Sequence, residues 1–176
     1  LFPVACLFRQ KILLWYVHRS CPVELILSEK LVNRIFTVSS ASFPLCSKKV
    51  RFVGHGIDTR RFYDFGKYRN TVENICLVGR ITAVKNTLDV VKNFLLVAER
   101  NGNIRLFVVG MLVIDRDSEL SVEIVNELKR HSRGEVVIMK GQINFCEMPH
   151  FYNEMDFVLN FGDGGLDKAI LELMAC

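Results

Sequence analysis

The sequence predicts an α/β protein built on parallel, doubly wound sheets. Short strands that are apolar throughout alternate with segments whose apolar residues recur at helical spacing, and glycines follow the strands. A strand that is apolar at every position is buried on both faces, which is typical of a parallel sheet covered by helices. Hydrophobic residues make up 50% of the 176, enough to bury the core of such a sheet.

The regular alternation begins near Asn74. We expect strands over residues 75–78, 106–109, 136–139 and 157–160. Helical spacing predicts helices over residues 88–98, 120–128 and 148–155, and a further helix after the glycine-rich turn at 162–165. In that closing helix, the predicted core stripe consists of Leu166, Ala169, Ile170, Leu173 and Met174.

The earlier part of the chain follows the same pattern less regularly. Strands are expected over residues 12–17, 35–38 and 51–53, with a helical piece over 28–33. Residues 64–74 are polar and aperiodic, so we interpret them as a linker. The predicted organisation is therefore residues 1–63 as the last part of one domain, 64–74 as the linker, and 75–176 as a second, incomplete domain.

Composition and charge narrow the function classes. The net charge of +4 is scattered, which favours an anionic ligand or an acidic membrane surface over nucleic acid. The six cysteines form no CxxC pair and the histidines lack metal spacing, so no metal or disulfide framework is expected. Without a leader or a span long enough to cross a bilayer, the sequence indicates a cytoplasmic protein, with peripheral attachment to the inner membrane face as an option.

The ligand edge of the sheet is predicted where the strands end. Parallel sheets bind ligands at the carboxyl ends of their strands, and here Arg80, Gly110, Gly141 and the glycine turn follow those ends. A glycine turn before a helix directs backbone N–H groups at one point and suits a phosphate, although the glycines could serve turn geometry alone.

Arg80 and Lys85 follow the first strand of the regular part and could bind phosphate oxygens. The alternative is a pair of solvated surface charges. Glu172 lies off the apolar stripe of the closing helix and could accept ribose hydroxyls, or be an ordinary exposed carboxylate. The sequence has no GxGxxG, which disfavours a sugar-nucleotide epimerase or dehydrogenase, and no P-loop or nucleophile-elbow motif.

Several segments, taken in order, resemble one family. "VGHGIDTRRF" (53–62), "VGRITAVKN" (78–86), "LFVVG" (106–110), "VVIMKG" (136–141), "MPHFYNEMDFVLN" (148–160) and "LDKAILELMAC" (166–176) match its sequence of motifs. The chain thus resembles the glycosyltransferase group 1 family, the retaining GT-B enzymes often called family 4. The resemblance implies a GT-B fold, with part of a Rossmann-like N-terminal domain before the nucleotide-sugar domain.

The resemblance also implies roles for particular residues. Arg80 and Lys85 would bind the donor diphosphate and stabilise its charge as the sugar leaves, without a metal. His18 matches a histidine near the transferred sugar, although it could be a polar residue at a strand end. The implied donor-binding residues are Gly79, Gly110, Gly141, Gly164, Gly165, Leu166 and Glu172.

The family's first acidic residue is missing. In this chain it falls at Gly164, with Asp163 and Asp167 nearby, so the recognition of the sugar hydroxyls is open. The family's sequence continues on both sides of this chain, and we therefore expect a fragment.

The implied function is sugar transfer, with retention of anomeric configuration, from a nucleoside diphosphate sugar to a saccharide or lipid-linked acceptor. The fragment alone is expected to be inactive, and no cofactor besides the donor is implied. The alternative is a nucleotide-binding or interaction module that does not transfer a sugar.

Overall fold

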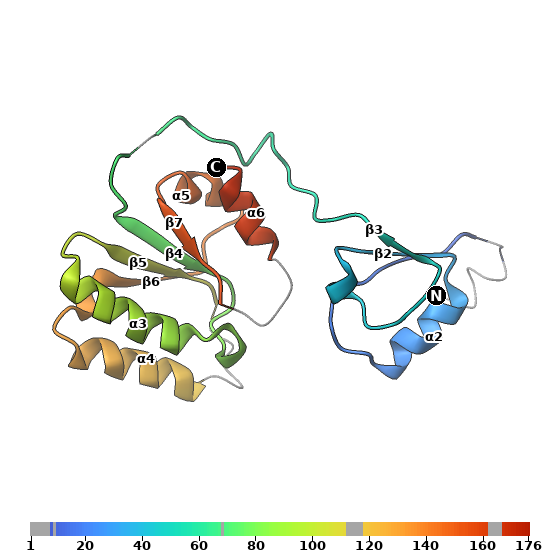
Figure 1. Cartoon of the computed structure of the whole chain (residues 1–176), viewed down its shortest axis with the longest axis horizontal. Coiled ribbons are helices and arrows are strands. Elements are labelled where there is room, and N and C mark those ends of the chain that lie inside the picture. Colours follow the sequence, from blue (N-terminus) through green and yellow to red (C-terminus); the bar gives the residue numbers. More distant parts are fainter. Residues whose placement is uncertain (1–7, 9, 68, 112–117, 162–166) are drawn as a thin grey trace. The chain divides into compact units, whose positions relative to one another are not determined.

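The computed structural model describes residues 8, 10–67, 69–111, 118–161 and 167–176. The chain divides into two compact units, Leu1–Gly56 and Ile57–Cys176. Both contain a parallel sheet with helical segments (Figure 1).

The first unit holds a parallel sheet in the order β1-β2-β3 over its described residues. Its strands are β1 (Leu13–Trp15), β2 (Arg34–Thr37) and β3 (Val50–Phe52), and its α-helix is α2 (Val23–Leu31). Leu25, Val32, Ile35 and Phe43 form the buried core.

Helix α2 begins earlier than the segment 28–33 that periodicity predicts. Pro22 is its N-cap, and proline's fixed φ suits the start of a helix. The helix ends before Asn33, whose side-chain Oδ1 accepts a hydrogen bond from the backbone N of Ile12 at 2.7 Å. Only Leu25 of α2 is buried, so its apolar periodicity is a weak signal.

The second unit is built on a parallel sheet whose described strands lie in the order β6-β5-β4-β7. The strands are β4 (Asn74–Val78), β5 (Arg105–Val109), β6 (Val137–Gly141) and β7 (Phe157–Leu159). They match the four strands expected from the sequence within a few residues.

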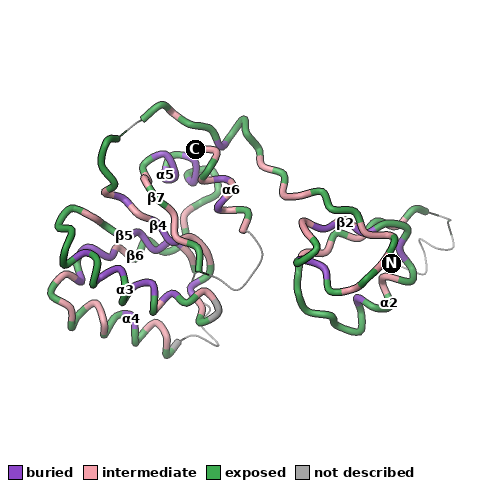
Figure 2. Tube along the Cα trace, in the orientation of Figure 1, coloured by how far each residue is buried: buried purple, intermediate pink, exposed green. Residues whose placement is uncertain are grey.

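Helices cover both faces of this sheet, as a doubly wound fold requires. They are α3 (Thr87–Arg100), α4 (Ser118–Arg130), α5 (Met148–Tyr152) and α6 (Lys168–Met174). Figure 1 shows α3 and α4 side by side on one face, with α5 and α6 on the other. Buried and exposed positions alternate along α3, as its amphipathic sequence predicts (Figure 2).

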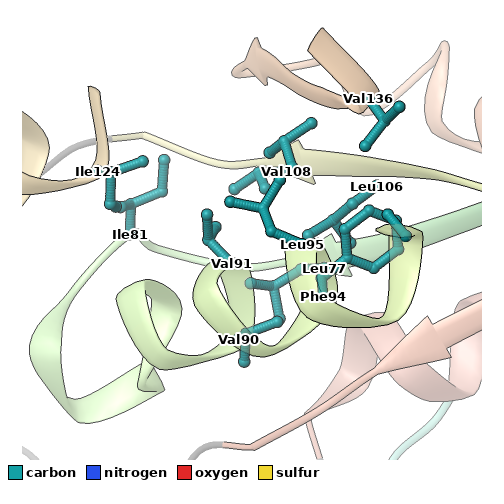
Figure 3. Close-up of a cluster of buried hydrophobic side chains, with 12 residues drawn as sticks. Leu77, Ile81, Val90, Val91, Phe94, Leu95, Leu106, Val108, Ile124 and Val136 are labelled. Atoms are coloured by element: carbon teal, nitrogen blue, oxygen red, sulfur yellow. The ribbon is translucent and has the colours of Figure 1, made fainter. Parts of the chain in front are cut away.

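Each strand sends successive side chains into two different cores. Leu77, Leu106 and Val108 join α3 in the first core, together with Ile124 of α4 (Figure 3). Their neighbours Cys76, Phe107 and Val109 face the second core, beneath α5 and α6. This alternation explains why the strands are apolar at every position.

The boundary between the units lies earlier than the predicted linker at 64–74. Phe62 is only 1% exposed and packs against Tyr152 in the second core. Asn153 receives a hydrogen bond from the backbone N of Phe65 at 2.7 Å, and its amide donates to the carbonyl of Tyr63 at 3.0 Å.

Hydrogen bonds also attach the end of the predicted linker to the second unit. The carboxylate of Asp156 accepts the backbone N–H groups of Glu73 and Asn74 at 3.0 and 2.8 Å. Residues 57–74 therefore belong to the second unit. The polar composition of this segment predicts a linker because the side chains that bind its backbone, Asn153 and Asp156, lie about 80–90 residues further along the chain.

Candidate functional site

The strand order predicts that the ligand crevice of the second unit lies between β4 and β7. From β4 the chain continues outward through β5 and β6, then returns to the other side of β4 as β7. This reversal is a topological switch point, where open α/β sheets form their ligand crevice. The segments leaving β4 and β7 at this point carry Arg80, Lys85 and Asp167.

Glycines let the strand ends approach one another closely. Gly79 and Gly110 have φ of 141° and 155°, a region that other residues rarely adopt. A Cβ atom at Gly110 would overlap the carbonyl of Gly79. The backbone N of Gly79 donates to Val109 at 2.9 Å, and that of Gly110 donates to Gly141 at 2.9 Å. Strand-end packing alone thus requires glycine at 110, whatever ligand binds.

Backbone hydrogen bonds within the segment after β4 fix its conformation. Residues Ala83–Lys85 form a 3-10 turn, and Asn86 follows in the left-handed conformation with φ 52°. The side-chain Nδ2 of Asn86 donates to the carbonyl of Phe161, just beyond β7, at 3.0 Å. Asn86 thus joins the segments on the two sides of the switch point. Its left-handed conformation is one that asparagine adopts more readily than most residues.

Arg80 and Lys85 line one small hollow, of about 10 Å³, at this edge. Both line it together with Gly79, Asn160 and Phe161. Arg80 is exposed, and within the described part of the chain no ion pair or hydrogen bond to its side chain is found. Lys85 is more enclosed, with 21% of its side chain exposed, and its Nζ forms an ion pair with Oδ2 of Asp167.

Asp167 lies at this site, although the sequence indicates only that it is near the missing acidic residue. The structure pairs it with Lys85 across the switch point. It is the N-cap residue of α6, yet its side chain makes no capping hydrogen bond. The available signal was its position just before the helix, combined with the convergence of both segments on one edge.

Glu172 lies in a different environment from the one predicted. It is 6% exposed, which contradicts the alternative of an ordinary exposed carboxylate and leaves the proposed contact with ribose untested. One of its oxygens, Oε1, is 3.1 Å from Nζ of Lys168, which compensates the buried carboxylate. Met174, expected in the core stripe, is 73% exposed. Of the predicted stripe, Ile170 is buried and Leu173 packs against the second core. Glu172, about 160° around the helix from Ile170, is buried as well.

The groups around Glu172 are held in their neutral forms. Burial, with a contribution from the charge of Glu172, raises the pKa of Tyr152. Burial also raises the pKa of Cys176, and it raises that of Cys76 to about 12. None of these side chains is an activated nucleophile, because activation needs a lowered pKa.

His18 lies in the first unit, after β1. Its Nδ1 accepts hydrogen bonds from the backbone N of Ser20 at 3.0 Å and is 2.8 Å from the Ser20 hydroxyl. The tautomer that fits an accepting Nδ1 has its proton on Nε2. The exposed His18 can thus donate a hydrogen bond through Nε2.

The remaining predicted residues divide into two groups. Gly141, with φ 70°, ends β6 next to Gly110. Asp163, Gly164, Gly165 and Leu166 lie outside the described residues.

A larger cavity of about 530 Å³ lies beside the edge strand β7. Apolar residues of α3 and β7 form most of its lining, including Phe94, Val97 and Phe157. Neither Arg80 nor Lys85 is among its lining residues, but the cavity shares Phe161 with the hollow that the two cations line.

Among the residues that the structure describes, no three His, Cys, Asp or Glu side chains cluster in a way that could hold a metal ion. No helix of the described residues combines the length and apolar character needed to cross a bilayer.

The comparisons with known proteins concern the fold. No protein-family model and no curated protein matches the sequence. Among solved structures, Anabaena Alr3699/HepE in complex with UDP and glucose matches with a TM-score of 0.77 and 12% identity. The match covers 99% of this chain and 53% of that one. A glycosyltransferase from Rickettsia africae matches with a TM-score of 0.76 and 14% identity, over 99% of this chain and 52% of that one.

The fold is that of the GT-B glycosyltransferases. The C-terminal domain of LpcC, a group 1 family glycosyltransferase from Francisella tularensis, also matches, with a TM-score of 0.58 and 22% identity. That match covers 68% of this chain and 66% of the other. This chain spans about half the length of the Anabaena protein, 53%.

Proposed function

We propose that this chain is part of a retaining glycosyltransferase of the group 1 family, which transfers a hexose from a nucleoside diphosphate sugar. The observation that carries the proposal is the position of Arg80 and Lys85. Both cations line one hollow at the carboxyl ends of the strands, beside the switch point of a GT-B sheet. A diphosphate is the part of a sugar nucleotide that needs such charges.

In the proposed reaction, the two cations act on the leaving diphosphate. The bond from the sugar to the diphosphate breaks, and negative charge grows on the phosphate oxygens. Arg80 offers a planar fork for two oxygens, and Lys85 offers a single ammonium charge. We propose that these side chains, rather than a metal ion, supply the positive charge.

Further residues are assigned to the donor by the same proposal. Gly79, Gly110 and Gly141 carry no side chains, so the donor can approach the strand ends closely. Oε2 of Glu172, the oxygen not paired with Lys168, would accept the ribose hydroxyls. In the first unit, His18 would donate through Nε2 to the transferred sugar.

Proteins of the same fold support the choice of substrates. Anabaena Alr3699/HepE was solved with UDP and glucose, and the pneumococcal O-GlcNAc transferase GtfA with UDP and GlcNAc, the latter at a TM-score of 0.72 and 12% identity. We propose a nucleoside diphosphate hexose as donor and a saccharide, free or lipid-linked, as acceptor. Since the chain spans 53% of the Anabaena protein, we propose that transfer requires the longer protein and that the chain alone only binds.

Binding of nucleoside diphosphates tests the site directly. We expect calorimetric titration of a panel of nucleoside diphosphates to show binding, and Arg80→Ala and Lys85→Ala to weaken it. Each substitution removes a charge-assisted hydrogen bond, which contributes about 1.5–3 kcal/mol. Arg100→Ala, at the far end of α3 from Lys85, is the matched control and should bind like the wild type. Equal affinity in all four proteins would place both cations on the solvated surface.

Transfer itself separates the two function classes. We expect the longer protein to release nucleoside diphosphate from a sugar nucleotide and to form a product with the donor's anomeric configuration, visible by proton NMR. Binding without transfer would instead support a nucleotide-binding or interaction module.

A further inference from the structure

Asp167 and Lys85 bring opposite charges together at the proposed phosphate site. They come from segments far apart in the sequence, one following β4 and the other preceding α6. The side chain of Lys85 is 21% exposed and that of Asp167 is 36% exposed, so water screens the pair only in part. The pair therefore neutralises one of the two cations at this edge.

Within the described part of the chain, the carboxylate of Asp167 makes no capping hydrogen bond and is available for this pairing. An aspartate at an N-cap usually accepts a hydrogen bond from the first turn of its helix. At Asp167 the backbone is extended, with φ −70° and ψ 139°, and the side chain makes no such bond. It contacts Lys85 instead.

The segment that carries Lys85 does not need this ion pair to keep its conformation. The backbone N of Lys85 donates to Thr82 at 3.1 Å, and that of Asn86 donates to Ala83 at 2.9 Å. The side chain of Asn86 links the same segment to Phe161. Lys85 can therefore exchange its partner while the backbone around it stays in place.

We propose that Asp167 is a built-in competitor of the donor diphosphate. In the unliganded chain its carboxylate occupies the ammonium of Lys85, and a bound diphosphate takes its place. A phosphate oxygen beside Lys85 would lie next to a second negative charge, so Asp167 lowers the affinity of the site for anions. This proposal rests on the proposed function, because it takes Lys85 as a phosphate ligand.

Inorganic pyrophosphate is the probe, since it presents the diphosphate without base or sugar. We expect Asp167→Asn to bind pyrophosphate at least about threefold more tightly than the wild type at low salt, with a smaller gain at high salt. Glu123→Gln, which removes one exposed charge from α4, is the control for net charge and should not tighten binding. In a Lys85→Ala background, Asp167→Asn should no longer strengthen binding, because the ammonium for which Asp167 and pyrophosphate compete is absent.

The opposite sign would overturn the proposal. If Asp167 instead held Lys85 in the orientation that a diphosphate needs, Asp167→Asn would weaken binding. Equal affinity in the wild type and Asp167→Asn would overturn it as well.

Labelling of Lys85 by an amine-reactive reagent gives a second readout that needs no ligand. We expect faster labelling in Asp167→Asn, because the carboxylate no longer covers the ammonium, and slower labelling of both proteins in pyrophosphate. If pyrophosphate neither binds nor protects Lys85 in either protein, the diphosphate site itself fails, and competition for it is excluded. If the wild type binds but Asp167→Asn does not bind more tightly, only the role of Asp167 fails.

Discussion

Two carboxylates near α6 show how burial and pairing decide what a residue can do. Asp167, at the helix start, is partly exposed and paired with a cation from another segment. Glu172 is buried and paired within its own helix, with Lys168. A partly exposed pair between segments can exchange partners, whereas a buried carboxylate keeps its compensating charge because losing it is costly. Glu172 can therefore act on a ligand only through the oxygen that Lys168 leaves free.

Substitution of Glu172 tests its proposed contact with ribose. We expect Glu172→Gln to weaken binding of a ribonucleoside diphosphate by about 1–3 kcal/mol, since a charged acceptor becomes neutral. A 2′,3′-dideoxy nucleotide cannot donate these hydrogen bonds, so it should bind both proteins equally. Isothermal titration of the longer protein measures both affinities.

Lys168→Gln is the matched control for this measurement. It breaks the same ion pair but leaves the carboxylate, so any loss due to the ion pair would appear for both nucleotides. If Glu172→Gln weakened the two nucleotides alike, or neither, Glu172 would be excluded as a ribose ligand.

At the scale of elements, the ends of β4 and β5 constrain one another. The carbonyl of Gly79 lies where a side chain at Gly110 would begin. The β4–β5 ladder stays in register up to Val78 and Val109, and beyond it Gly110 bonds to Gly141 after a register shift in the β5–β6 ladder. The glycines of this edge are therefore structural requirements first, and an open surface for the ligand follows from them.

Stability should respond to this constraint. We expect Gly110→Ala to reduce the free energy of unfolding of the second unit by at least about 2 kcal/mol, through backbone strain and overlap with Gly79. Gly102→Ala is the control: its nearest atom, on Arg133, would be 3.9 Å from the added Cβ, and we expect a change within about 0.5 kcal/mol. Hydrogen exchange of amides in β4 and β5 measures the unit directly. Equal protection in the two variants would contradict the constraint.

At the scale of the whole molecule, the division of the chain is set by burial rather than composition. The segment 57–74 has the polar character of a linker, but Phe62 is buried beside Tyr152 and Phe145. Asn153 and Asp156 then fix the backbone on either side of Gly66. The second unit therefore includes a long segment ahead of its first strand.

Limited proteolysis should locate this boundary. With a protease of broad specificity, we expect the first cuts near residues 53–57, leaving a stable fragment that begins before Phe62. Residues 63–65 and 73–74 should resist cleavage because hydrogen bonds to Asn153 and Asp156 hold their backbone. In Phe62→Ala, which removes about 3–5 kcal/mol of packing, cuts within 64–74 should appear earlier. A first cut inside 64–74 of the wild type would restore the linker predicted from composition.

By itself, the sequence determined the class of fold, the strands of the second unit and the edge on which Arg80 and Lys85 lie. These depend on local signals, namely apolar periodicity and the residues that follow each strand. Tertiary structure alone decided the boundary at Gly56, the burial of Glu172 and the pairing of Lys85 with Asp167. Each of these joins segments distant in sequence, and neither periodicity nor composition records which distant groups will meet.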